Sequence, residues 1–286
     1  MAVSEKDAGT WSKEKVVSTL PVRTADSHKG TYGTGLLVAG SRNMPGAAML
    51  AGLGAMRTGV GKLVIGTDEQ VIPIVVQQLP EATYEPNALE RIAKGEMTID
   101  NLRVTAIGPG IVPDEVAERA IHKILASGAP VILDAGALSK REYTNRIAPT
   151  ILTPHPLEFS RITGVKVSEL QQNRVHYARI CSKKLGAAIV LKGKETVIAF
   201  PDGDTWINPT GNSALSKGGT GDTLTGMLLG MLCIHDDWKH AVLNAVFLHG
   251  ACADAWTETR SAHAMLAHEL TELLPEIWKG YEQSQR

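Results

Sequence analysis

Residues 104–110 read VTAIGPG, an apolar run that ends abruptly in glycine and proline. Five other stretches have the same form: GLLVAGS (35–41), GKLVIGT (61–67), PVILDAG (130–136), TILTPHP (150–156) and AAIVLKG (187–193). The runs are rich in Val, Ile and Leu without a clear alternation of apolar and polar residues, which is typical of strands that are covered on both faces. Because helical-looking segments separate several of these runs, the sequence predicts a mainly parallel α/β sheet.

The segments around these runs predict the remaining elements. Helices are expected at residues 45–58, 114–127 and 167–185, and later at 222–234, 238–257 and about 261–274,. Residues 194–212 read KETVIAFPDGDTWINPTGN and predict two antiparallel strands joined by a turn at 202–204,. No internal repeat or linker interrupts the chain, so residues 1–286 are expected to form a single domain with about the first 25 residues as a peripheral segment,.

Composition excludes several classes of protein. The chain has 286 residues, 43% of them hydrophobic, and 29 Lys plus Arg stand against 30 Asp plus Glu, so no overall field favours a nucleic-acid partner,. The longest apolar stretch, 227–234, is far shorter than the roughly 20 residues of a membrane span, so no membrane partner is expected,. The cysteines are dispersed, which favours a reducing compartment, and without the apolar core of a secretory signal the expected location is the cytoplasm,.

The ends of the predicted strands carry the unusual residues. In open parallel sheets ligands bind beyond the carboxyl ends of the strands. The stretches at these ends are Gly40–Ser41, Gly108–Gly110, Asp134–Gly136, Thr153–Pro156 and Lys192–Lys194. Any one of them would mean little, because turns after strands commonly need glycine. Five at corresponding places predict one crevice that they share.

One glycine-rich stretch is the candidate anion site. Gly30, Gly33 and Gly35 precede a strand, unlike a dinucleotide fingerprint, and the chain has no GxxxxGK[ST] phosphate loop,. Residues 216–228 read SKGGTGDTLTGML, where glycines lead into an apolar helix whose unpaired N–H groups favour an anion,. Gly219, Thr220 and Gly221 are expected to hold a phosphoryl group during its transfer.

Asp222 has two interpretations. As an acceptor for the proton of an attacking hydroxyl it would be a catalytic base, kept ionised by the helix dipole. The alternative is that Asp222 simply caps its helix.

Several motifs in order resemble one enzyme family. They are HKGTYG (28–33), LLVAGS (36–41), MPGAAMLAGLGAMRTGVG (44–61), IGPG (107–110), LDAGAL (133–138), LTPHPLEFSRITG (152–164), VLKGKETVI (190–198), NPTGN (208–212) and GGTGDTLTG (218–226). Together they resemble the ADP/ATP-dependent NAD(P)H-hydrate dehydratases of the ribokinase-like superfamily, over about residues 28–254. The resemblance is to the stand-alone form, without the epimerase domain of some relatives. It implies a ribokinase-like three-layer α/β/α sandwich with a mainly parallel central sheet.

The resemblance also implies the reaction and the site. Family members convert hydrated NADH or NADPH back to NADH or NADPH, with ATP or ADP phosphorylating the ring hydroxyl before phosphate is lost. Mg²⁺ and a homo-oligomer, such as a tetramer, are further expectations. By motif matching Asp222 would be the base and Gly221 an anion-hole or nucleotide contact. The remaining assignments are Lys192, Gly193, Lys194, Glu195 and Thr196 for the nucleotide, and Ala47, Gly110, His155 and Asp222 for the hydrated dinucleotide.

One departure from the family bears on the metal. Many relatives read DADAL where this chain reads DAGAL at 134–138, so a carboxylate is missing at Gly136, and Asp134 and Glu158 remain as candidates to organise Mg²⁺,. The scattered histidines His176, His235, His240 and His249 lack metal-ligand spacing and are expected to be ordinary surface or core residues,.

Some of these assignments have competing interpretations. His155, between two prolines, could simply brace its loop instead of contacting the substrate. The whole chain could be a sugar, pyrimidine or thiazole kinase on the same fold, which would release a stable phosphate ester. It could also be a nucleotide-sensing subunit without catalysis.

Overall fold

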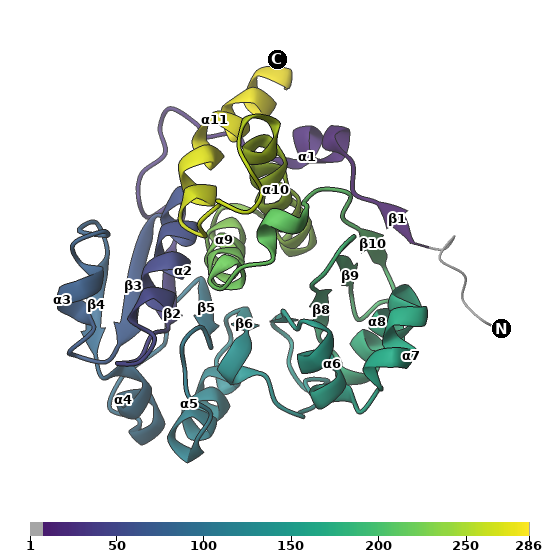
Figure 1. The fold of residues 1–286 in the computed structure, drawn as a ribbon. Coiled ribbons are helices and arrows are strands. Elements are labelled where there is room, and N and C mark those ends of the chain that lie inside the picture. The colour runs from purple at the N-terminus through teal and green to yellow at the C-terminus, as the bar shows by residue number, and fades with distance from the viewer. Residues whose placement is uncertain (1–7, 286) are drawn as a thin grey trace.

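The structure, a computed structural model, describes residues 8–285, which build one ten-stranded sheet with helices on both faces (Figure 1). The strands are β1 (Gly9–Thr10), β2 (Thr34–Val38), β3 (Lys62–Thr67), β4 (Thr83–Pro86), β5 (Val104–Ile107), β6 (Val131–Leu133), β7 (Thr150–Leu152), β8 (Ala188–Leu191), β9 (Val197–Ala199) and β10 (Thr205–Ile207). Their order across the sheet is β1-β10-β9-β8-β7-β6-β5-β2-β3-β4. From β8 to β4 all neighbours are parallel, and β9 and β10 form the predicted antiparallel hairpin. All six apolar runs are strands, so the prediction of a mainly parallel sheet is confirmed.

Residues along each strand alternate between two apolar cores, which explains why the runs show no polar face. Leu37 of β2 and Ile132 of β6 belong to the core under α2, α9 and α10. Their neighbours Leu36 and Leu133 belong to the core on the opposite face. Burial on both faces favours apolar residues along the central strands and produces a three-layer α/β/α arrangement.

The helices divide between the two faces (Figure 1). The first face carries α1 (Lys13–Thr19), α2 (Pro45–Arg57), α3 (Ile72–Val75), α9 (Thr220–Ile234), α10 (Trp238–Thr259) and α11 (Glu269–Ser284). The second carries α4 (Ala88–Lys94), α5 (Glu115–Ala126), α6 (Pro156–Thr163), α7 (Val167–Gln172) and α8 (Arg174–Leu185). Short 3₁₀ turns η2 (Ala135–Ala137) and η3 (Ser213–Leu215) follow β6 and precede α9.

Two helix predictions were wrong. The helix expected at 167–185 is two helices, since Asn173 leaves helical geometry and its side chain accepts a hydrogen bond from the His176 N–H, starting α8 afresh,. The helix expected from about 261 begins at Glu269, after a series of turns. By contrast, the predictions of α2 and α5 match the structure within a residue at each end.

The N-terminal segment lies at the edge of the sheet, where β1 pairs with β10. Trp11, Val16 and Leu20 are nevertheless buried in the core, and the Trp11 indole N–H donates to the Asn244 side chain at 2.9 Å. The described part of this segment is therefore anchored to α10; residues 1–7 lie outside the described residues.

Helices α2 and α9 approach each other at backbone distance. A Cβ added at Gly226 of α9 would overlap the carbonyl oxygen of Ala51, and one added at Gly54 of α2 would overlap the carbonyl oxygen of Thr223. No side chain fits in either place. Two glycines thus fix the position of α9 relative to α2 and the sheet behind them.

The carboxyl ends of β8, β7, β6, β5 and β2 lie side by side in this order. The residues that follow these strands therefore meet at one edge of the sheet, beneath the start of α9.

Candidate active site

The start of α9 differs from the predicted start by two residues. Gly219, with φ at +93°, is the N-cap residue, and Thr220, Gly221 and Asp222 form the first turn. No side chain caps this helix, so the alternative of Asp222 as a simple cap is wrong. The first-turn N–H groups have no partner within the helix, which leaves them available to an anion, and the Thr220 hydroxyl donates to backbone carbonyls of the preceding loop (Leu215 at 2.9 Å, Lys217 at 3.0 Å),.

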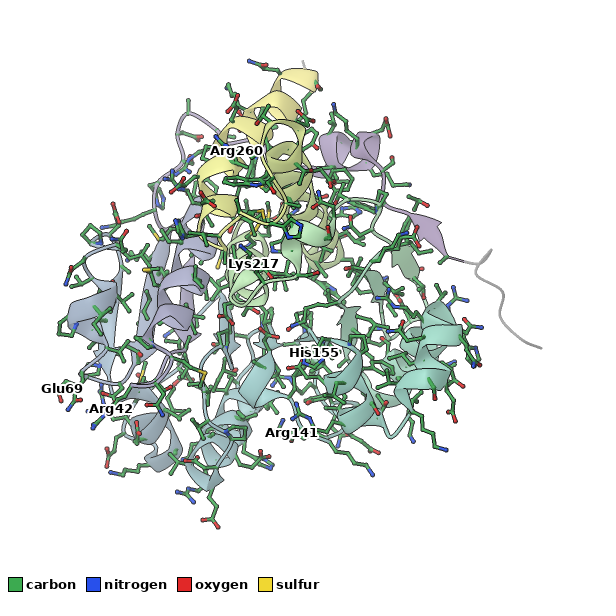
Figure 2. The ribbon with its side chains drawn as sticks, viewed as in Figure 1. Arg42, Glu69, Arg141, His155, Lys217 and Arg260 are labelled. Atoms are coloured by element: carbon green, nitrogen blue, oxygen red, sulfur yellow. The ribbon has the colours of Figure 1, made fainter. Side chains whose placement is uncertain are left out.

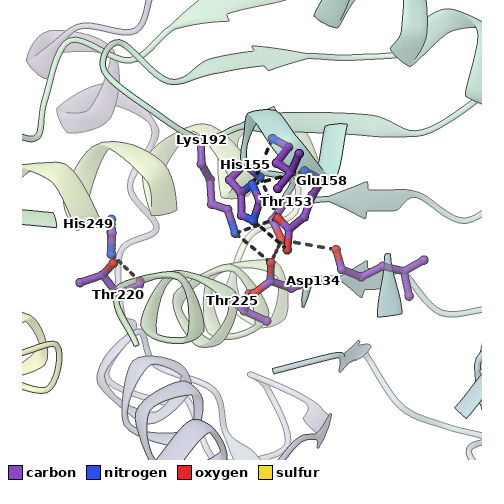
Figure 3. Close-up of polar contacts among 10 residues, drawn as sticks. Asp134, Thr153, His155, Glu158, Lys192, Thr220, Thr225 and His249 are labelled. Atoms are coloured by element: carbon purple, nitrogen blue, oxygen red, sulfur yellow. Dashed lines mark hydrogen bonds and ion pairs between the residues drawn. The ribbon is translucent and has the colours of Figure 1, made fainter. Parts of the chain in front are cut away.

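Asp134 is the centre of a polar cluster next to this turn (Figure 3). Its Oδ1 accepts hydrogen bonds from the Thr153 hydroxyl at 2.7 Å and from the Lys192 ammonium at 3.0 Å. Its Oδ2 accepts from the hydroxyl of Thr225, one turn beyond Asp222 on α9, at 2.9 Å. Asp134 is only 1% exposed, so it ties together the ends of β6, β7 and β8 and the first turns of α9,.

Asp222 and Lys192 have shifted pKa values for different reasons. Burial first, and then the negative charge of Asp134, raise the pKa of Asp222 to about 7, although Lys192 opposes the shift. Burial alone would lower the pKa of Lys192, but Asp134 and then Glu158 outweigh it and raise the pKa. The expectation that the helix dipole keeps Asp222 fully ionised is therefore wrong. A carboxyl that titrates near neutrality beside a permanent cation is suited to accept and release a proton.

Two cavities adjoin this cluster at the carboxyl ends of the strands, where a shared crevice is predicted. The first, of about 550 Å³, brings together Lys192, Gly193, Lys194, Thr196, Thr220 and Gly221 with residues of the NPTGN loop and α10. The second, of about 480 Å³, is lined by residues that include Met44, Gly110, Ala135, Gly136, Glu158 and Arg161. The cavities share no lining residue, yet the Lys192 ammonium lies 3.9 Å from a carboxylate oxygen of Glu158. Glu195 and Gly219 are adjacent to lining residues of the first cavity without lining it themselves.

Ala47 and His155 lie beside the second cavity and do not line it. Ala47 is buried, and its Cβ would lie 2.8 Å from a Cβ added at Gly110, so it packs behind that glycine. His155 is the N-cap of α6: its Nδ1 accepts from the N–H groups of Leu157 and Glu158, and the Glu158 carboxylate accepts from the His155 N–H at 2.8 Å. Figure 2 shows His155 near the middle of the view. The structure thus gives His155 the contacts of a loop brace, and its side chain is still 48% exposed.

The protein residues do not fit a metal site of their own. Both oxygens of Asp134 are taken by hydroxyl and ammonium donors, and Glu158 caps α6 and faces Lys192. A Cβ added at Gly136 would overlap the carbonyl oxygen of Ile111, so a carboxylate at 136 would require the backbone to move. Over residues 8–285, no three His, Cys, Asp or Glu side chains gather so that they could hold a metal ion. Asp134 and Glu158 are thus engaged with donors of the protein itself, and a role for them in organising Mg²⁺ stays a prediction,.

Several site residues escaped the sequence analysis. His249 lines the first cavity, its Nε2 lies 2.9 Å from the Thr220 carbonyl oxygen, and burial lowers its pKa to about 4, so it is neutral. Asn212 and Gly211 are held by the carboxylate of Asp254 on α10, which fixes the NPTGN loop over the cavity. The NPTGN motif marks Gly211 and Asn212 in the sequence, but their contact with α10, which places them over the cavity, joins residues more than 40 positions apart.

The comparison with known proteins fits this geometry. The model of the NAD(P)H-hydrate dehydratase family matches residues 35–276. The chain belongs to this family. The ADP-dependent (S)-NAD(P)H-hydrate dehydratase of Bacillus subtilis (strain 168) is 61% identical over 272 residues, which are 95% of this chain and 98% of that protein. The Asp222 helix and both cavities lie within the matched region.

Solved structures of similar proteins have the same fold as this chain. A crystal structure of the ADP/ATP-dependent NAD(P)H-hydrate dehydratase from Bacillus subtilis, co-crystallized with ATP/Mg²⁺, superposes with a TM-score of 0.94 at 60% identity, covering 96% of this chain and 99% of that one. A ribokinase-like superfamily protein from Enterococcus faecalis V583 has a TM-score of 0.85 at 24% identity and covers 99% of both chains. The predicted ribokinase-like three-layer fold is thus confirmed. In the described part of the chain, no helix is both long and apolar enough to span a bilayer.

Proposed function

We propose that this protein dehydrates hydrated NADH or NADPH to NADH or NADPH in a reaction that consumes ATP or ADP. One observation carries the proposal: a partly buried carboxyl with a pKa of about 7, Asp222, lies in the first turn of α9, next to Gly221 and within the field of the Lys192 cation, both of which line the first cavity, although Asp222 lines neither cavity itself. The family of the chain favours this function over a small-molecule kinase of the same fold.

The chemistry assigns a task to each group. The Asp222 carboxylate accepts the proton of the ring hydroxyl while that oxygen bonds to the terminal phosphorus of the nucleotide and the bond to the bridging oxygen breaks. The N–H groups of Thr220 and Gly221 stabilise the charge on the transferred group, and the Lys192 ammonium holds a phosphate of the bound nucleotide before the transfer. Inorganic phosphate then leaves the ring, and loss of a proton from the neighbouring carbon restores the double bond.

The two cavities support a division between the substrates. We place the nucleotide in the first cavity, against Lys192–Thr196 and Gly221, because cations and an open helix start suit phosphates,. The hydrated dinucleotide then occupies the second cavity, near Gly110, Ala47 and His155. Because the protein offers no metal cluster in the described residues, Mg²⁺ would arrive with the nucleotide phosphates. A cytoplasmic homo-oligomer completes the proposal, and the three free, buried cysteines support a reducing compartment,.

The test is to mix the protein with hydrated NADH and either ADP or ATP and to follow the absorbance of reduced nicotinamide and the release of phosphate. The proposal predicts that both rise together. A stable phosphate ester without new absorbance would establish the kinase instead. Nucleotide binding without either product would establish a sensing subunit.

A further inference from the structure

Arg174, the first residue of α8, is outside the reaction centre but touches the loop proposed to hold the nucleotide. Its Nη2 donates to the carbonyl oxygens of Leu191 at 2.9 Å and Lys192 at 3.2 Å, and its Nη1 donates to the carbonyl oxygen of Lys194. One guanidinium therefore binds three carbonyl groups, one at the end of β8 and two in the loop 192–196 that follows it. Its planar, rigid set of donors suits this role in a way that a lysine ammonium does not.

The loop is shaped around this guanidinium. Gly193 has φ at +140°, and a Cβ added there would lie 3.0 Å from Arg174 Nη2, so a side chain at 193 would press against the guanidinium. Glu195 has φ at +54°, a left-handed conformation that is uncommon outside glycine,. Such a backbone needs surrounding structure to hold it, and Arg174 supplies the hydrogen bonds.

These carbonyl contacts determine where the N–H groups of the loop point. In a planar trans peptide the C=O and the following N–H point in opposite directions, and the described chain has no cis peptide bonds,. With the carbonyls of Lys192 and Lys194 directed at Arg174, the N–H groups of Gly193 and Glu195 point away from it. Within residues 8–285 neither N–H donates a hydrogen bond, and Gly193 lines the first cavity. The Gly193 N–H is therefore a free donor in the wall of the first cavity, where it can serve an anion,.

We infer that Arg174 is a positioning residue for nucleotide binding: it holds the carbonyls of residues 191, 192 and 194 so that the loop 192–196 presents the Gly193 N–H and Lys192 to the phosphates. This inference rests on the proposed placement of the nucleotide in the first cavity. Arg174 itself does not line that cavity. Its loss should weaken nucleotide binding without affecting the hydrated dinucleotide.

The chain offers a matched control in Arg146. This arginine also donates to two backbone carbonyls, those of Ser127 at 3.3 Å and Ala129 at 2.8 Å, and burial lowers its pKa as it does that of Arg174. It lies at the amino ends of β6 and β7, however, on the opposite edge of the sheet from the cavities. Removal of either guanidinium should lower the stability of the protein by a comparable amount. Only the removal of the Arg174 guanidinium should weaken nucleotide binding.

The experiment measures ADP affinity by calorimetry, and the KM of each substrate, for Arg174→Ala, Arg174→Lys and Arg146→Ala. We expect Arg174→Ala to weaken ADP binding by about 10–100-fold, the loss of a few charge-assisted hydrogen bonds, while the KM for hydrated NADH changes less than about twofold. Arg174→Lys should retain an intermediate affinity, and Arg146→Ala should bind ADP like the parent protein. If Arg174→Ala does not fold, Arg174→Lys and Arg174→Gln decide by the same comparison.

Equal ADP binding by the Arg174 variants and the parent would overturn the inference, as would an equal loss in Arg146→Ala. A parent protein that binds ADP in an Arg174-dependent manner, yet does not dehydrate hydrated NADH, would contradict the proposed function and leave the role of Arg174 supported. A parent protein that binds neither ADP nor ATP would overturn both.

Discussion

The pKa of Asp222 is set by two opposing effects, the helix start, which lowers it, and burial, which raises it by more. The start of a helix favours a negative charge by about 0.3–1 kcal/mol when it is exposed to solvent. Burial and the neighbouring charge of Asp134 act in the opposite direction and raise the pKa from 3.8 to about 7. At about 1.4 kcal/mol per pH unit, this shift is larger than the contribution of the helix, so Asp222 is poised to exchange a proton at neutral pH.

Asp222→Asn separates catalysis from folding. The amide keeps the size of the side chain but cannot accept the hydroxyl proton, so we expect kcat to fall by about 10²–10⁴-fold while nucleotide binding is retained. Because the pKa of Asp222 is higher in the folded state than in the unfolded one, its ionisation reduces stability progressively between pH 3.8 and about 7,. The variant should therefore melt at a higher temperature than the parent at pH 8. Steady-state turnover and thermal melting check these two expectations. An unchanged kcat would show that Asp222 is not the catalytic base.

The pH dependence of kcat/KM should report the same group. The base acts in its deprotonated form, so activity should rise about tenfold per pH unit below a pKa of about 7 and level off above it,. Lys192, with its raised pKa, stays charged across this range. A profile measured from about pH 5 to 9 that is flat through pH 7 would mean that another group takes the proton.

At the scale of elements, the site depends on one loop and one helix. The loop 192–196 connects β8 to β9 and carries the lysines of the first cavity, and α9 carries Asp222. Glycine backbone contacts with α2 fix α9, while hydrogen bonds from Arg174 hold the loop. Each element can be altered separately.

Replacement of Lys192 and Lys194 by Ala tests whether the loop 192–196 binds the nucleotide. We expect the KM for nucleotide to rise by more than kcat falls, because these cations stabilise the bound nucleotide before reaction. Lys183→Ala, an exposed lysine on α8 that lines neither cavity, is the matched control. Thermal melting must accompany the kinetics, since Lys192→Ala leaves the buried Asp134 without its cation,. An unchanged KM for the nucleotide would mean that the nucleotide does not bind in the first cavity.

Gly226→Ala tests whether the close packing of α9 against α2 is needed for stability and activity. Its methyl group would meet the backbone of Ala51, so α9 must shift away from α2, and we expect a loss of about 1–3 kcal/mol in unfolding free energy together with lower kcat,. Gly46→Ala in α2 has no neighbouring atom within 4 Å of the added Cβ and should be neutral or slightly stabilising,. Denaturant unfolding of the two variants makes the comparison; equal stability would show that the contact between the helices is not tight.

Much of the fold was predictable from short stretches of sequence. Most of what was not predictable depends on contacts between residues far apart in the chain. Six apolar runs with glycine or proline at their ends identified six strands, because burial on both faces leaves a plain signal. The edge strands β1 and β4 are too short and polar to give that signal. The site was predictable where a motif carries it, at Gly221 and Lys192. The position of Asp134 was not, because its contact with Thr225 joins residues 91 positions apart, and a single carboxylate looks the same in the sequence whether it binds a metal or a hydroxyl.

At the scale of the whole molecule, the sheet brings distant parts of the chain to one edge. Lys192 follows β8, Asp134 follows β6, and Asp222 comes from a helix in the last third of the sequence. The ribokinase-like fold supplies only this edge.

The separation of the two cavities has a kinetic consequence. Because the two cavities have different lining residues, each ligand has its own set of contacts, and we expect each to bind whether or not the other is present. Transfer from nucleotide to ring hydroxyl without a phosphorylated protein residue requires both at once, so we expect a sequential mechanism with random order of addition. Double-reciprocal plots at several fixed concentrations of ADP should intersect to the left of the ordinate, and a product analogue of either substrate should compete only with its own counterpart. Parallel lines, the sign of a covalent intermediate, would contradict this arrangement.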